Sequence, residues 1–219
     1  MNNLWYKPLS FDDFYGNKEV KDLVETIIKK PNVVLVTGKS GVGKTAFARL
    51  FAKKFSKSSI RDLQRMIMTG DDFYTEDIFF VKDIEVKEFN DDRIYIIEDA
   101  HYLGKNEQNK LLDAITALPN SLFIIVTVDK GYLSEEILSK VEYEFNITAP
   151  TVDEQVKLLE QLCKEKAILT KVNNFDAQIE LLVHLRHGEN KSIDFRSLVD
   201  EECLRQSMIN LDLYLSENK

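Results

Sequence analysis

Short runs of consecutive apolar residues recur along the first two thirds of the chain, and stretches with apolar residues at helical spacing separate them. The apolar runs lie at residues 33–36, 78–81, 94–97, 122–127 and, more weakly, 143–147. Runs of this kind are typical of strands buried on both faces of a parallel sheet. Helical spacing is found at residues 17–30, 106–118 and 133–140. This alternation predicts an α/β fold in which helices flank a parallel sheet.

The pattern changes after Pro150, where the strand-like runs stop. Thr151, followed three residues later by Glu154, forms a capping box, which typically begins a helix. Further helices are predicted over residues 176–187 and from Ser192 onward. The predicted domains are an α/β domain, 1–150, and a small all-helical domain, 151–219.

The composition narrows the class of protein. The hydrophobic fraction of 44% and the charged fraction of 30% are ordinary for a globular protein, and no apolar run is long enough to cross a bilayer. The first residues lack the layout of a secretory signal, and Cys163 and Cys203 are the only cysteines. We therefore expect a cytoplasmic protein without disulfides, membrane contact or a structural metal site. The net charge of −8 repels polyanions, so any DNA contact requires a local patch or a partner.

A glycine-rich segment lies between the first predicted strand and a helix. Residues 38–45 read Gly-Lys-Ser-Gly-Val-Gly-Lys-Thr, which is the complete phosphate-loop pattern. The glycines let backbone amides surround phosphate oxygens, Lys44 reaches the terminal phosphates and Thr45 offers its hydroxyl to magnesium. The sequence therefore predicts a site for ATP with magnesium. The predicted nucleotide contacts in this segment are Gly38, Lys39, Ser40, Gly41, Val42, Gly43, Lys44, Thr45 and Ala46.

Two carboxylates, Glu98 and Asp99, follow the apolar run at 94–97. Phosphate-loop ATPases place a metal-holding acid and a water-orienting acid at the end of such a strand, usually in the order Asp then Glu. Here the order is reversed. Glu98 is therefore predicted to face the magnesium ion, and Asp99 to orient the water with a side chain one methylene shorter. Because a displacement of about 1 Å can cost about a hundredfold in rate, we expect at most a weak ATPase.

Three more polar residues draw attention by their positions. Thr127 ends the run at 122–127 and could place its hydroxyl beside the γ-phosphate, although a threonine that merely favours β structure is the alternative. Arg196 begins the last predicted helix and could reach a phosphate, with a solvated arginine as the alternative. We interpret His101 as a surface histidine on a loop.

The segment from Tyr6 to Asn17, YKPLSFDDFYGN, is similar to one that lines the adenine pocket in AAA+ ATPases of the clamp-loader type. This group includes the γ/τ and δ′ subunits of bacterial DNA polymerase III. The resemblance continues at residues 38–45 (Walker A), 94–99 (Walker B), 122–129 (first sensor) and 195–198 (second sensor). It implies that Phe14 and Tyr15 contact adenine and that Thr127 and Arg196 are sensors. It also implies that the helical domain is a lid on an AAA+ nucleotide-binding domain.

Three features depart from this group. Lys140 lies where the group has an arginine that acts on a neighbouring subunit's ATP, and lysine lacks the planar guanidinium fork. Residues 56–73 occupy the interval in which the group has a four-cysteine zinc module, and we expect no collar domain after the lid. Clamp-loader assembly in its usual form is therefore not implied.

The resemblance implies a replication-associated ATPase that couples ATP binding, and slow hydrolysis, to the assembly of a protein partner on DNA. Its expected partners are other AAA+ or replication subunits, or further copies of the chain. The first alternative is a nucleotide-switched structural subunit that scarcely hydrolyses ATP. The second is a P-loop kinase for a small molecule, which the adenine and lid segments disfavour.

Overall fold

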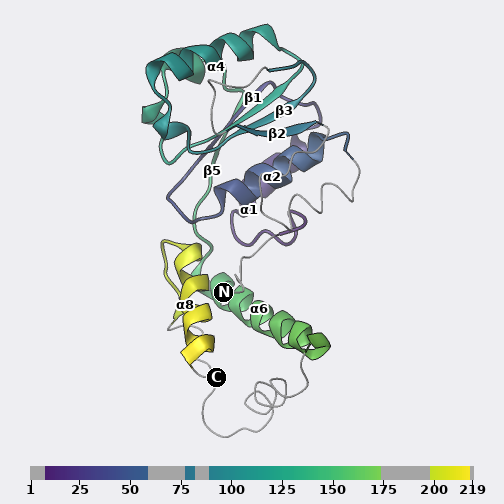
Figure 1. The fold of residues 1–219 in the computed structure, drawn as a ribbon, viewed down its shortest axis with the longest axis vertical. Helices are drawn as coiled ribbons and strands as arrows, with labels where there is room; N and C mark the ends of the chain where they lie inside the picture. Colours follow the sequence, from purple (N-terminus) through teal and green to yellow (C-terminus); the bar gives the residue numbers. More distant parts are fainter. Residues whose placement is uncertain (1–7, 59–76, 82–88, 174–197, 218–219) are drawn as a thin grey trace, which may run out of the picture. The chain divides into compact units, whose positions relative to one another are not determined.

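The computed structural model describes residues 8–58, 77–81, 89–173 and 198–217. The chain divides into two compact units, the first ending at Ala149 and the second beginning at Pro150. Within the described residues, all the strands belong to the first unit, and the second unit contains helices (Figure 1).

A five-stranded parallel sheet forms the centre of the first unit, in the order β2-β3-β4-β1-β5 (Figure 1). The strands are β1 (Val33–Thr37), β2 (Ile78–Val81), β3 (Ile94–Ile97), β4 (Leu122–Val126) and β5 (Tyr143–Asn146). The predicted parallel sheet is confirmed. β4 and β5 each end one residue earlier than predicted. Because β1 lies between β4 and β5, the turn that follows β1 is flanked by the ends of two neighbouring strands.

Helices cover both faces of this sheet (Figure 1). On one face lie α1 (Lys18–Thr26) and α2 (Lys44–Phe55), and on the other α4 (Lys105–Ala117) and α5 (Glu135–Leu138), with the 3-10 turns η1 (Ala100–Tyr102) and η2 (Lys130–Tyr132) between elements. Successive strand residues alternate between the two cores. On β3, Ile96 packs in the core with α2, and Tyr95 and Ile97 pack in the core with α4.

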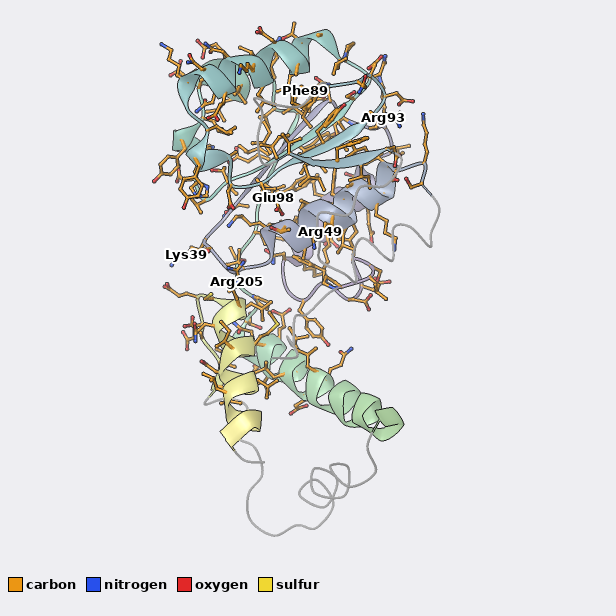
Figure 2. All side chains as sticks on the ribbon, viewed as in Figure 1. Lys39, Arg49, Phe89, Arg93, Glu98 and Arg205 are labelled. Carbon is orange, nitrogen blue, oxygen red and sulfur yellow. The ribbon has the colours of Figure 1, made fainter. Side chains whose placement is uncertain are left out.

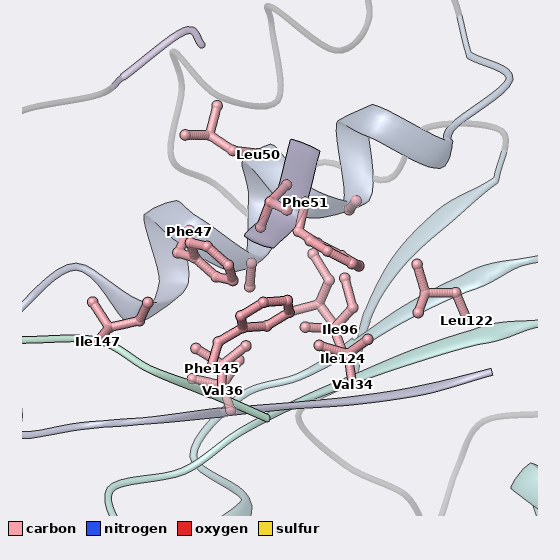
Figure 3. Packing of buried hydrophobic residues seen from close by; sticks show 14 of the residues in the cluster. Val34, Val36, Phe47, Leu50, Phe51, Ile96, Leu122, Ile124, Phe145 and Ile147 are labelled. Carbon is pink, nitrogen blue, oxygen red and sulfur yellow. The ribbon is translucent and has the colours of Figure 1, made fainter. Parts of the chain in front are cut away.

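The core beneath α2 is rich in aromatic residues (Figure 3). The ring centroid of Phe145 lies 5.1 Å from that of Phe47 and 5.4 Å from that of Phe51. All three side chains are fully buried, and burial of each stabilises the fold by about 1.5–3 kcal/mol. Phe47 lies in the first turn of α2, where its backbone N–H donates to Gly43 O at 2.9 Å. The aromatic core therefore fixes the start of α2, and with it the loop that leads into the helix.

The first helix is shorter than its apolar spacing predicts. The pattern extends over residues 17–30, but α1 ends at Thr26, and Ile28 is 93% exposed. The ammonium of Lys54, on α2, donates a hydrogen bond to the backbone carbonyl of Val24. The same carbonyl accepts the backbone N–H of Ile27 at 3.2 Å, so it is paired twice at the end of the helix. The helix predicted over residues 133–140 is likewise reduced to the single turn of α5.

The second unit contains α6 (Val152–Asn173) and α8 (Leu204–Glu217), which pack against each other (Figure 1). The predicted capping box is present, because Thr151 N donates to Glu154 Oε2 at 2.9 Å. Residues 199–203, expected within the last helix, form a loop in which Asp200 Oδ1 accepts two backbone N–H bonds. The helix predicted over residues 176–187 lies outside the described residues. No helix in the described parts of the chain has the length and apolar character needed to span a membrane.

Candidate nucleotide-binding site

The carboxyl ends of β1, β4 and β3 bring the predicted site residues to one edge of the sheet. The loop at residues 38–43 follows β1, Thr127 follows β4 and Glu98 follows β3. Because β4 lies between β1 and β3, Thr127 is placed between the loop and the acid. Figure 2 shows Glu98 at the edge where α2 begins, and Arg93 at the opposite edge. Strand ends of parallel sheets are where such folds bind ligands.

Glycines give the loop at residues 38–43 its path. Gly38, Gly41 and Gly43 have φ angles of 139°, 81° and 107°, in a region that other residues rarely adopt. A Cβ on Gly38 would lie 2.1 Å from the carbonyl oxygen of Ile147, which follows β5. The backbone N–H of Gly38 also donates to Val128 O at 3.4 Å. The loop is therefore held between the ends of β4 and β5, with room for backbone alone.

Lys44 folds back over the loop. Its Nζ donates to the carbonyl oxygen of Lys39 at 2.8 Å, so its positive charge lies where the loop curves. Lys39 and Ser40 are exposed, whereas the Val42 side chain is buried and leaves only its backbone available to a ligand. Thr45, like the adjacent Ala46, is half-buried in the first turn of α2. The loop thus offers a phosphate its amide groups, an ammonium and a hydroxyl.

The two acids after β3 occupy different environments. Glu98 is half-buried, and its Oε1 is fully buried without a hydrogen-bond partner among the described residues. Asp99 is exposed, and its backbone is left-handed, with φ 51° and ψ 40°. A buried, unpaired carboxylate oxygen costs about 1–3 kcal/mol or more, and a cation would supply the missing partner. Glu98 therefore fits the predicted magnesium ligand.

Thr127 is fully buried at the end of β4. Its backbone N–H donates to Val36 O at 3.0 Å, which continues the ladder with β1. Its hydroxyl donates to Asp129 O at 2.9 Å. The hydroxyl proton is therefore used in a hydrogen bond within the turn after β4. The first-sensor role remains a prediction, and it requires the hydroxyl to donate to a phosphate instead.

The aromatic residues predicted to line the adenine pocket differ in exposure. Phe14 is only 3% exposed, with its ring centroid 6.0 Å from that of Phe47 and a ring atom 3.4 Å from a Cβ built on Gly43. Phe14 therefore supports the loop from the core, and its ring face is not open to a base. Tyr15 is half-buried, and its contact with adenine remains a prediction.

The sequence interpretation missed the contact that Asn17 makes with Thr148. The Asn17 side chain pairs with the backbone of Thr148, donating from Nδ2 to Thr148 O at 2.9 Å and accepting from Thr148 N at 2.9 Å. This pairing joins the predicted adenine-lining segment to the residues after β5, which also touch Gly38. Because the two residues are 131 positions apart, no local pattern could have revealed the contact.

The remaining predicted residues are less well connected to the site. His101 is not a free surface side chain, because its Nδ1 is buried and its ring centroid lies 4.1 Å from that of Tyr102. Lys140 is exposed after α5, and Arg196 lies outside the described residues. Within the described residues, no group of three or more histidine, cysteine, aspartate or glutamate side chains could hold a metal ion. A magnesium ion here would depend on few protein oxygens together with phosphate, as is usual for this ion.

Known proteins resemble this chain at the levels of sequence and fold. Residues 17–153 match the family model described as the Sigma-54 interaction domain. The DNA polymerase III subunit gamma/tau of Mycoplasma pneumoniae is 25% identical over 222 residues, which cover 90% of this chain and 31% of that protein. The corresponding subunit of Mycoplasma genitalium is 24% identical over 210 residues, covering 76% and 33% respectively. The chain thus spans about a third of the length of these relatives.

A solved structure, the RuvB Holliday junction branch migration motor of Thermotoga maritima, has a TM-score of 0.53 to this chain. It is 16% identical, and the match covers 95% of this chain and 72% of that one. At this identity the similarity establishes a shared fold.

Proposed function

The chain belongs to the Sigma-54 interaction domain family and has the fold of clamp-loader-like AAA+ ATPases, and on this premise we propose that it binds ATP with magnesium to assemble a protein partner on DNA. ATP binding, with slow hydrolysis, would drive this assembly. Other AAA+ or replication subunits, or further copies of the chain, are the proposed partners. The support for a replication role is the similarity to the gamma/tau subunits.

The observation that carries the nucleotide site is the buried, unpaired Oε1 of Glu98. It lies at the sheet edge that also holds the glycine loop and the start of α2 (Figure 2). Magnesium takes one or two protein oxygens and completes its shell with phosphate and water. Glu98 and the hydroxyl of Thr45 would supply the protein oxygens, and bound magnesium would neutralise charge on the phosphates. Lys44 would exchange its bond to the Lys39 carbonyl for a phosphate oxygen.

The rate of hydrolysis depends on Asp99 in this proposal. A water-orienting acid has to be held within a few tenths of an ångström, yet this side chain is exposed. Its short carboxylate and left-handed backbone therefore favour slow turnover. The same observation supports a second candidate, a structural subunit that changes its conformation on binding ATP and scarcely hydrolyses it.

Phosphate release under saturating Mg-ATP distinguishes these functions. It would be measured at several protein concentrations, with and without primed DNA, and the nucleotide retained by the protein would be measured in the same samples. Turnover that rises with protein concentration or DNA supports the proposed ATPase. Retained ATP with negligible release supports the structural subunit. Phosphate transfer to a small-molecule acceptor would instead identify a kinase.

Nucleotide binding itself is tested by calorimetric titration of Lys44→Ala. We expect this variant to lose ATP binding, because the ammonium over the loop is removed. The control is Lys29→Ala, since Lys29 is an exposed lysine of the same unit outside the loop. Equal affinities in the two variants would contradict the phosphate-loop assignment.

Restoration of the missing arginine by Lys140→Arg should raise turnover only at concentrations at which the protein forms oligomers.

A further inference from the structure

Two exposed tyrosines and the half-buried His101 form an aromatic surface next to the acids after β3. The ring centroid of His101 lies 4.1 Å from that of Tyr102 and 5.9 Å from that of Tyr132. Tyr102 is 80% exposed and Tyr132 is 56% exposed. Tyrosine is enriched at protein interfaces, where it presents a large apolar face with a polar tip. We call His101, Tyr102 and Tyr132 the aromatic surface.

The half-buried side chain of Gln108 holds the segments of the aromatic surface together. Gln108, on α4, donates from Nε2 to the carbonyl oxygens of Leu103 and Tyr132, at 3.0 and 2.9 Å. Its Oε1 accepts the backbone N–H of Ser134 at 2.8 Å. A single side chain thus joins the end of η1, the end of η2 and the start of α5. Because the surface is already formed, a partner would lose little affinity to ordering it.

The charges around the aromatic surface are mainly negative. Residues 98–107 and 129–136 contain six carboxylates and two lysines. One of these lysines, Lys130, forms a salt bridge with Glu144 at 3.0 Å. The carboxylates in the two segments are Glu98, Asp99, Glu107, Asp129, Glu135 and Glu136. A nucleic-acid backbone would be repelled here, whereas a cationic side chain would be attracted both by the carboxylates and by the ring faces.

We propose that the aromatic surface docks a protein partner through arginine or lysine side chains of that partner. Arginine fits best, because its planar guanidinium stacks on aromatic rings and pairs with carboxylates. The aromatic surface lies next to the site acids, since the backbone N–H of Tyr102 donates to Asp99 O at 2.9 Å. The proposal concerns binding alone and requires neither ATP binding nor hydrolysis.

The test is binding of a fluorescent peptide of alternating arginine and glycine, followed by anisotropy at physiological salt. A peptide with glutamate in place of arginine serves as the negative probe. We expect the double variant Tyr102→Ser, Tyr132→Ser to bind the arginine peptide about five- to thirtyfold more weakly, because two exposed cation–π contacts are lost. The double variant with phenylalanine at both positions keeps the rings and should bind nearly as the unaltered chain does.

Ile28→Ser is the matched control, because it removes a 93% exposed apolar side chain elsewhere in the same unit. Urea unfolding checks that all variants are folded. Three results would overturn the proposal: equal peptide affinity in the serine variant and the unaltered chain, tighter binding of oligothymidylate than of the arginine peptide, or self-association through the tyrosines without peptide binding. The first would leave the carboxylates alone as the attraction, and the others would identify a different occupant.

Discussion

Replacement of Gly38 by alanine tests whether the end of β5 determines the shape of the phosphate-binding loop. The added Cβ would lie 2.1 Å from the backbone oxygen of Ile147, whereas real contacts of this kind essentially never fall below 3.0 Å. One of the two backbone segments would therefore have to move by about 1 Å, which can cost about a hundredfold in turnover. The φ angle of 139° adds strain of about 1–3 kcal/mol. We expect Gly38→Ala to lower the free energy of unfolding by at least about 2 kcal/mol and to weaken ATP binding.

Alanine substitutions at Gly43 and Gly104 separate the effect of backbone strain at positive φ from the effect of a steric collision. Gly43 shares the positive φ, but a Cβ built on it would meet only ring atoms of Phe14, at 3.4 and 3.6 Å. Gly104 has an ordinary φ of −71°, and its Cβ would meet a carboxylate oxygen of Glu107 at 3.4 Å. Urea unfolding followed by circular dichroism should rank the losses as Gly38→Ala, then Gly43→Ala, then Gly104→Ala. A Gly38→Ala variant no more destabilised than Gly43→Ala would contradict the collision with the Ile147 backbone.

Three further changes probe the acids, a surface cluster and the helical unit. Exchange of the site acids, Glu98→Asp with Asp99→Glu, should raise phosphate release if their reversed order limits it, and an unchanged rate would leave the missing arginine as the cause. Hydrogen bonds from Lys57 and a second lysine lower the pKa of Asp92 from its ordinary 3.8 to about 2. The pairing of ionised Asp92 with these lysines therefore stabilises the fold above pH 4, and this stabilisation is lost as the pH falls toward 2. Lys57→Met should raise the pKa of Asp92 in an NMR titration, and an unmoved pKa would contradict the pairing. In the helical unit, Gln155 is fully buried and makes three hydrogen bonds through its side chain. Gln155→Leu should cost about 2–3 kcal/mol in urea unfolding because Pro150 O, Asp200 O and Ser207 Oγ each lose one hydrogen bond, and a neutral effect would show that the site relaxes.

The fold of the first unit was largely readable from the sequence. Strand positions follow from short apolar runs, which a sheet covered by helices on both faces can bury, and the predicted and observed bounds of β2 and β3 coincide. The loop from Gly38 to Thr45 was equally clear, because its glycines, lysine and hydroxyl are adjacent in the chain. The helical spacing was less reliable at its ends. It shows which face of a helix is apolar, but not where the helix ends, and so the pattern over residues 17–30 extends past the end of α1 at Thr26 to the exposed Ile28.

By itself, then, the sequence determined which segments form strands and which carries the phosphate loop, because both depend on neighbouring residues. The tertiary structure alone decided the environment of each site residue. The strand order places Thr127 between the loop and Glu98, and the packing buries one oxygen of Glu98 while it leaves Asp99 exposed. The same packing buries Phe14 beneath the loop. Burial, charge environment and pairing depend on residues brought together from distant parts of the chain, and no local pattern records those contacts.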